Sequence, residues 1–317
     1  MASQTFAAEN PADETSDRRV PLPALLPPAF LNHRAVFVVV GAGLLALTIS
    51  GVVINPLDMP LLAGAIILVL GVPHGAFDVA VWTDRNGLGR RPAISTMLFG
   101  YVALAGGFFG LWLMAPALAL PVFLAMSIYH FSGDWDHDLD RLPRLLVAAA
   151  MITAPAGLHR GEVVEIFSWL APEPVANSVG LIMAAMALPL LQASVVVIAL
   201  IASQRPWAAA ELVVVLALAW LTPPMLFFLV YFCGLHSMRH MIETHQQLHS
   251  ASVGAFFRSA LPYAPLAIIG TLIGAFGMST LPPGPALIGM IFMALGALTV
   301  PHIVVVELCS PGPRARD

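Results

Sequence analysis

Charged side chains, and lysine above all, are what this sequence most lacks. Only 10% of its 317 residues are charged, against about 25% in an average soluble protein. Lysine is absent, all 14 basic residues are arginines, and the formal net charge is −4. A nucleic-acid-binding face needs an excess of basic residues, so we expect no nucleic-acid partner.

Cysteine is nearly absent as well. Cys233 and Cys309 are the only two, and each lies in or beside an apolar stretch. A disulfide framework or a thiolate metal site needs several cysteines at regular spacing. We therefore expect both thiols to be inert groups in the protein interior.

Hydrophobic residues, in contrast, are abundant. They make up 59% of the chain, and the mean hydropathy is +0.86. One soluble core could not hide this much apolar surface, so the sequence predicts an integral membrane protein surrounded by a lipid bilayer. Apolar windows close to the length of a membrane crossing lie at 35–54, 58–82, 94–114, 116–132, 142–157, 177–203, 207–221, 224–243, 261–281 and 286–308.

These windows predict an all-α fold, a polytopic membrane bundle of about ten transmembrane helices. Residues 1–33 are polar, acidic and rich in proline, which predicts a disordered N-terminal tail. Residues 34–309 then form a single transmembrane catalytic domain, and 310–317 form a short C-terminal tail.

The arginines predict the orientation. Arginine collects in cytoplasmic loops next to the membrane. With ten crossings and a cytoplasmic N-terminus, twelve of the fourteen arginines fall on the cytoplasmic side. Arg160 lies outside, and Arg239 lies within the eighth predicted helix. Both termini are therefore predicted to be cytoplasmic.

Histidines are the polar residues that stand out within the apolar windows. A membrane histidine can simply hydrogen-bond two neighbouring helices. Here, however, five histidines from four predicted helices share one layer near the cytoplasmic side, whereas His159 falls on the opposite side. Ionisable residues inside a membrane are costly and tend to mark function. The five are His74, His130, His236, His240 and His302.

The stretch "GLHSMRHMIE" is the strongest local signal. His236 and His240 are four residues apart, so both side chains leave one helix face close enough to bind one metal ion. The residues between them lack the glutamate of the H-E-x-x-H motif, which removes the general base of a zinc protease. Arg239 and Glu243, also four residues apart, are expected to neutralise each other.

Two carboxylates repeat the same spacing. Asp78 follows His74 by four residues, and Asp134 follows His130 by four. A metal-bound histidine usually donates its second ring N–H to a carboxylate, which orients the ring. We interpret Asp78 and Asp134 in this way, with a solvated loop as the alternative for Asp134. The next three acidic residues, Asp136, Asp138 and Asp140, are expected in a solvated loop.

Four imidazoles without a thiolate suit iron, zinc, copper or nickel rather than calcium or magnesium. An ion that takes six ligands would keep two positions free, as an iron centre needs to bind dioxygen beside a substrate. A site inside the bilayer favours a substrate that dissolves there, such as a fatty chain, a quinone or a carotenoid. The stretches "MLFFLVYF" and "IGMIFMALG" fit an apolar tunnel and fit helix packing equally well.

Five motifs, in this order, carry a resemblance that covers roughly residues 60–310. The motifs are "GVPHGAFD" (71–78), "YHFSGDWD" (129–136), "PAGLHRGEVVEIFSWL" (155–170), "YFCGLHSMRH" (231–240) and "LTVPHIVVVE" (298–307). With these motifs the chain resembles the Brp/Blh family of membrane-bound β-carotene 15,15′-dioxygenases.

This resemblance implies that dioxygen cleaves the central double bond of β-carotene, or of a related carotenoid, at a non-haem Fe(II). Two molecules of retinal would result, with a functional link to a rhodopsin-type protein. It also implies a multi-pass location in the bacterial cytoplasmic membrane.

The same resemblance implies a set of site residues. The iron ligands correspond to His74, His130, His236 and His240, while His302 is expected either beside the ligands or on the substrate side. One departure concerns the residue after Asp78, where the family often has a further histidine and this chain has Val79. This difference bears on carotenoid preference and activity.

Two other functions stay open on the residues alone. A lipid desaturase or hydroxylase would hold two irons in H-x-x-H-H boxes, and this chain has no adjacent pair of histidines. A transporter could use its histidines to relay protons; such proteins often show two related halves and broken helices, and we recognise no such halves. The metal content of the purified protein distinguishes these two functions from the carotenoid dioxygenase.

Overall fold

The structure is a computed structural model that describes residues 28–86, 90–248, 252–278 and 280–309. All regular secondary structure in these ranges is helical, which confirms the all-α prediction. In chain order the elements are α1 (Pro28–Ile49), η2 (Pro56–Asp58), α2 (Pro60–Ile66), η3 (Ile67–Gly71), η4 (Val72–Phe77), α3 (Asp78–Asn86), α4 (Arg90–Met114), α5 (Pro116–Ser132), η5 (Gly133–Trp135), α6 (Arg141–Thr153), α7 (Pro155–Ser168), α8 (Glu173–Ile201), α9 (Pro206–Leu221), α10 (Pro224–Phe228), η6 (Leu229–Ser237), α11 (Met238–Gln247), α12 (Val253–Ala260), α13 (Ala264–Gly277) and α14 (Pro283–Cys309).

Each of the ten apolar windows corresponds to helical structure. Seven helical segments are long and apolar enough to cross a membrane, or up to nine if each of two bent pairs is one span. The tenth window corresponds to α9, a shorter apolar helix. The chain is thus a polytopic membrane bundle, and ten crossings remain a prediction. The seven are Asn32–Ile49, Pro60–Arg85, Ile94–Met114, Pro116–Trp135, Glu173–Ile201, Pro224–Gln247 and Pro283–Cys309.

One window that the sequence predicted as a single helix is broken, and another begins at a bend. The window 142–157 falls on α6 and α7, which meet at an angle of 53°. The window 261–281 falls on α13, which meets the preceding helix α12 at 43°. Pro155 and Pro262 lie at the two breaks. A proline has no N–H for the helical ladder, and its ring clashes with the preceding turn, so a helix ends or bends there.

The predicted N-terminal tail is too long. Helix α1 begins at Pro28, so residues 28–33 are helical rather than disordered. Proline suits the first turn of a helix, where its missing N–H has no partner to lose, and the apolar residues that follow extend the hydrophobic stretch. Residues 1–27 and 310–317, where the two tails were predicted, lie outside the described residues.

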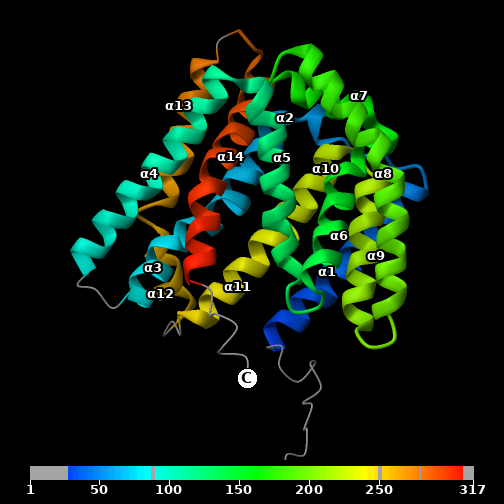
Figure 1. The fold of residues 1–317 in the computed structure, drawn as a ribbon, viewed down its shortest axis with the longest axis horizontal. Helices are drawn as coiled ribbons and strands as arrows, with labels where there is room; N and C mark the ends of the chain where they lie inside the picture. The colour runs from blue at the N-terminus through cyan, green and yellow to red at the C-terminus, as the bar shows by residue number, and fades with distance from the viewer. Residues whose placement is uncertain (1–27, 87–89, 249–251, 279, 310–317) are drawn as a thin grey trace, which may run out of the picture.

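Helix α14 lies at the centre of the bundle. It packs against α2, α4, α5 and α13, and Figure 1 shows it in the middle of the view, with α4 and α13 on one side and α7 and α8 on the other. Of its apolar window 67% is buried, against 11% for α4. The start of α1 and the end of α14 lie at the same end of the bundle, as an even number of crossings requires (Figure 1).

Two segments that carry histidines are irregular helices. His74 lies in the 3₁₀ turn η4, and His236 lies in the π-helical segment η6. Such departures from α-helical geometry often occur at functional sites. Gly71 precedes η4 where the two segments meet, and a Cβ there would collide with the ring of Phe232. A glycine at position 71 therefore lets the two histidine-bearing segments approach each other.

Candidate metal centre

Five imidazole rings from four parts of the chain form a closed circle. His130 comes from α5, His74 from η4, His236 and His240 from η6 and α11, and His302 from α14. Neighbouring ring centroids around the circle are 4.7 Å apart for His130–His236, 5.2 Å for His236–His74, 5.6 Å for His74–His240, 4.9 Å for His240–His302 and 5.0 Å for His302–His130. The residues that the sequence placed in one membrane layer therefore meet at one point.

Hydrogen bonds fix the tautomer of three of these rings. The Nδ1 of His74 lies 2.5 Å from the carbonyl oxygen of Gly71, that of His302 lies 2.8 Å from Asp78, and that of His236 lies 3.0 Å from Asp134. Carbonyl and carboxylate oxygens only accept, so each Nδ1 donates its hydrogen. In the neutral ring the Nε2 atom then keeps its lone pair, which is the form that binds a metal.

The Nε2 atoms have the environment that a metal ion requires. Those of His240 and His302 are buried, with no hydrogen-bond partner among the described residues. Those of His130 and His236 lie 3.1 Å apart. A buried polar atom without a partner costs about 1–3 kcal/mol, and a cation held by these lone pairs would remove that cost.

The distances also fit. One atom each from His74, His130 and His236 lie within 4.8 Å of one another, and the same is true of Asp78, His240 and His302. Two metal–nitrogen bonds of about 2.1 Å span at most about 4.2 Å, so small movements within either group would bring its three atoms onto an ion. The donor set, imidazole without thiolate, suits a transition metal.

Both carboxylates orient histidines, but not the ones that the sequence predicted. Asp78 accepts from His302 instead of orienting His74, and Asp134 accepts from His236 instead of orienting His130. The reason is local geometry. Asp78 follows a 3₁₀ turn and Asp134 lies in the 3₁₀ turn η5, so the spacing of an α-helix does not hold there.

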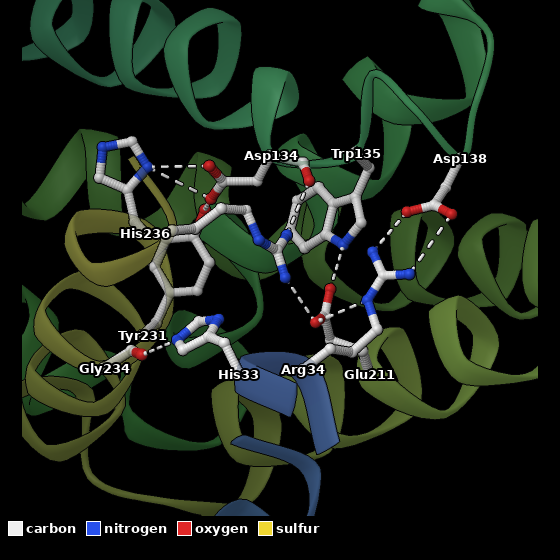
Figure 2. A network of polar contacts seen from close by, with 10 residues as sticks. His33, Arg34, Asp134, Trp135, Asp138, Glu211, Tyr231, Gly234 and His236 are labelled. Atoms are coloured by element: carbon white, nitrogen blue, oxygen red, sulfur yellow. Dashed lines mark hydrogen bonds and ion pairs between the residues drawn. The ribbon is translucent and has the colours of Figure 1, made fainter. Parts of the chain in front are cut away.

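A buried charged network surrounds Asp134 (Figure 2). Its carboxylate also accepts from the Tyr231 hydroxyl at 2.5 Å, and its backbone carbonyl accepts from Arg239 at 2.7 Å. Arg239 donates as well to Glu211 at 2.6 Å. Glu211, fully buried in α9, accepts further from Trp135 at 3.0 Å. The position of His236 is thus coupled to charges on three other helices.

The outer part of this network reaches α1. Arg34 donates to Glu211 at 3.1 Å and to Asp138 at 2.5 Å, and all three side chains are buried. Next to it, the ring of His33 lies 2.8 Å from the carbonyl oxygen of Gly234 (Figure 2). Helix α1 is therefore joined by hydrogen bonds to α9, to the loop after α5 and to η6.

Several sequence predictions about these residues are wrong. Asp138 was expected in a solvated loop, and it is buried against Arg34. His33 belongs to the stretch 1–33 that was predicted to be a disordered tail, and it is half-buried in α1. For Arg239 the sequence suggested Glu243, whose charge does act on it, and missed Glu211, with which Arg239 forms a buried ion pair. The available signal was that Glu211 is the only charged residue in the apolar window 207–221.

An apolar cavity of about 410 Å³ borders the histidine cluster. His74, His130 and His302 line it, together with aliphatic and aromatic side chains from several helices. The predicted apolar stretches supply Phe227, Phe228 and Phe292, and Val79, where the family often has a histidine, also lies on its wall. Its size and lining suit an apolar small molecule.

His159, which the sequence placed apart from the other histidines, lies in α7. Its backbone departs from helical geometry, with φ −116° and ψ 34°, and its Nδ1 lies 3.3 Å from a carboxylate oxygen of Glu162. It does not line the apolar cavity. The structure gives it a local hydrogen bond and no contact with the five-histidine circle.

Fold and site together define a class: an all-helical membrane protein with a buried cluster of histidines, able to hold a metal ion, beside an apolar cavity. Residues 65–310 match the family described as beta-carotene 15,15′-dioxygenase. The chain belongs to this family.

Two curated relatives carry the same description. The beta-carotene 15,15′-dioxygenase of uncultured marine bacterium 66A03 is 30% identical over 250 residues, which cover 77% of this chain and 91% of the relative. The probable beta-carotene 15,15′-dioxygenase Blh of Halobacterium salinarum is 27% identical over 306 residues, with 81% and 86% covered. No solved structure matches the chain significantly.

Proposed function

We propose that this protein uses dioxygen to cleave β-carotene, or a closely related carotenoid, at its central double bond, giving two molecules of retinal. The proposal rests on the circle of five imidazoles, three of which, His74, His130 and His302, lie on the wall of an apolar cavity. Family membership supplies the reaction class, since both curated relatives are described as beta-carotene 15,15′-dioxygenases.

We infer that the resident metal is Fe(II), held by His74, His130, His236 and His240. His302 lies within the same circle, its Nδ1 donates to Asp78 and its Nε2 has no partner among the described residues. We therefore infer that it is a fifth ligand rather than a residue beside the ligands. When bound, iron would supply the redox chemistry that lets dioxygen react with a carbon–carbon double bond.

The side chains of this protein perform the remaining tasks. Asp78 and Asp134 hold His302 and His236 in the tautomer with a free Nε2. The apolar wall binds the polyene and excludes water from the reacting carbons. Both oxygen atoms of one dioxygen molecule end in the two aldehyde groups, so the reaction needs no external reductant.

The product would be delivered to the membrane, where retinal dissolves. We infer that the protein lies in the cytoplasmic membrane of a bacterium, and that its retinal supplies a rhodopsin-type protein. The family match and the apolar helices support this setting.

The test is expression in a bacterial host engineered to make β-carotene, followed by chromatography of the extracted pigments. We expect β-carotene to fall and retinal to accumulate only when dioxygen is supplied. The matched control is the variant H74A, which removes one ring of the circle and should leave β-carotene intact. Retinal formation by H74A, or none by folded, iron-loaded wild-type protein, would contradict the proposal.

A further inference from the structure

The cavity beside the histidines has two ends of different character. One end is lined by residues of α6, α7, α8 and α10, and most of these residues are buried. They include Met151 and Met225, both fully buried, and Val163, Ile166, Phe167 and Met183, each at most 8% exposed. Among the described residues, this end is enclosed by protein.

The other end reaches the outer surface of the bundle. It is lined by residues of α4 and α13, and two of these face outward, Val102 at 67% exposed and Leu266 at 68%. Both are aliphatic, and both belong to helices at the edge of the bundle (Figure 1). A surface of this kind in a membrane protein faces lipid, so an apolar molecule can enter here without crossing water.

The helices that carry His130 and His302 lie between the two ends. His130 is on α5, which packs against both α4 and α6, and His302 is on α14, which packs against α4, α13 and α7. Figure 1 shows α5 and α14 between α4 and α13 on one side and α7 and α8 on the other. A long molecule that enters from lipid therefore passes the histidines before it reaches the enclosed end.

We propose that the enclosed end of this cavity measures the substrate: it receives one ring end of the carotenoid, and its depth determines which double bond lies beside His74, His130 and His302. This inference rests on the proposed function and adds the specificity determinant. Met151 and Met225 form the stop.

The chemistry of a conjugated polyene makes such a measurement effective. A carotenoid chain is a stiff rod, so the distance from its ring to each double bond is nearly fixed. In β-carotene the two halves are identical, and the central bond lies at the same distance from either ring. One enclosed end is therefore enough to select the central bond. The length of the other half of the substrate, which points toward α4 and α13, does not affect which bond is cleaved.

Two substitutions at Met225 change the depth in opposite directions. M225W fills part of the enclosed end, and M225A lengthens it. The substrate should carry only one ring, with an open-chain aldehyde at the other end, so that the ring-bearing product reports how deep the ring has moved. Wild-type protein is expected to give retinal as this product.

We expect M225W to give a ring-bearing product shorter than retinal, and M225A one longer than retinal, as read by chromatography and mass spectrometry. The matched control is L266W at the lipid-facing end, which should slow turnover and leave retinal as the product. If folded M225W and M225A both give only retinal, the enclosed end does not measure the substrate.

Overpacking can prevent folding, so each variant is checked for a monodisperse peak in detergent and for wild-type iron content. If M225W fails this check, M151F and M225A carry the test with the same expected product shifts. The two proposals fail in different ways. Wild-type protein that cleaves no carotenoid contradicts the proposed function, whereas wild-type cleavage with unshifted products in the variants contradicts only the measuring role.

Discussion

The two sides of the histidine circle are built differently. On one side, the Asp134–His236 pair is joined to a buried network that runs through Arg239 and Glu211 to Arg34. On the other side, the Asp78–His302 pair forms one further side-chain hydrogen bond within the described ranges, from the Tyr101 hydroxyl to Asp78 at 3.1 Å. His302 and Tyr101 also line the apolar cavity.

This difference separates two requirements of a metal enzyme in lipid. A charged network holds His236 in place, because the buried donors and acceptors of the network form their hydrogen bonds with one another. The cavity side needs an apolar wall for the substrate, so its carboxylate has few polar partners. We therefore expect changes on the Asp134 side to affect both stability and metal binding, and changes on the Asp78 side to affect mainly the reaction.

Removing an imidazole should have the largest effect. H236A and H302A, one on each side of the circle, should lose most bound iron and reduce carotenoid cleavage to background, because each removes a proposed ligand. Iron content by elemental analysis and retinal by chromatography are the measurements. H159A, outside the circle, is the control and should keep both. An H302A protein with full iron content and full activity would show that His302 is not an iron ligand and lies beside the ligands.

Breaking the charged network comes next. E211A leaves Arg34 and Arg239 without their shared buried carboxylate, and such a loss typically costs about 3–5 kcal/mol. We expect a large fall in thermal unfolding temperature in detergent. E211Q keeps the shape and two acceptor sites, and should lose less. Equal unfolding temperatures for E211A and the wild type would show that the network is not a structural support.

The orienting carboxylates allow a direct comparison of the two sides. D134N and D78N should each weaken iron affinity by about 10–100-fold, the usual effect of changing a partner of a metal-bound histidine. D134N should also lower the unfolding temperature more than D78N does, since only Asp134 belongs to the charged network. Metal titration and thermal unfolding of both variants test this, and identical unfolding losses would remove the distinction between the sides.

The two tyrosines should give the smallest effects. Y231F and Y101F each remove one hydroxyl that donates to a carboxylate, which is worth about 1.5–3 kcal/mol as a hydrogen bond to a charged group. The histidine keeps its carboxylate partner in both variants. We expect iron affinity to stay close to wild type. Y101F should alter carotenoid turnover more than Y231F, because Tyr101 lines the cavity; steady-state rates in detergent check this.

The sequence predicted the membrane fold and the candidate histidines because both depend on local composition. A long apolar window indicates a membrane-spanning helix whatever its neighbours are. Five histidines at the same depth in the membrane can lie close together in many arrangements of the helices, so their shared depth made them candidates before the arrangement was known. The bends at Pro155 and Pro262 were visible only as prolines, since the angle between two helices depends on their neighbours.

The pairing between helices could not be predicted in the same way. A spacing of four residues suggested that Asp78 orients His74, but the chain turns more tightly there and Asp78 meets His302, 224 residues away. Glu211 and Arg34 likewise find each other from α9 and α1. One sequence without an alignment carries no information on such distant contacts, although a lone charge in an apolar window indicates that a partner exists.

Iron-edge X-ray absorption on the purified wild-type protein shows whether imidazoles from η4, α5, η6, α11 and α14 hold one iron ion. We predict a first shell of nitrogen and oxygen donors with the outer-shell scattering of imidazole rings, and no second iron nearby. An iron–iron distance, sulfur donors or the absence of imidazole scattering would contradict it.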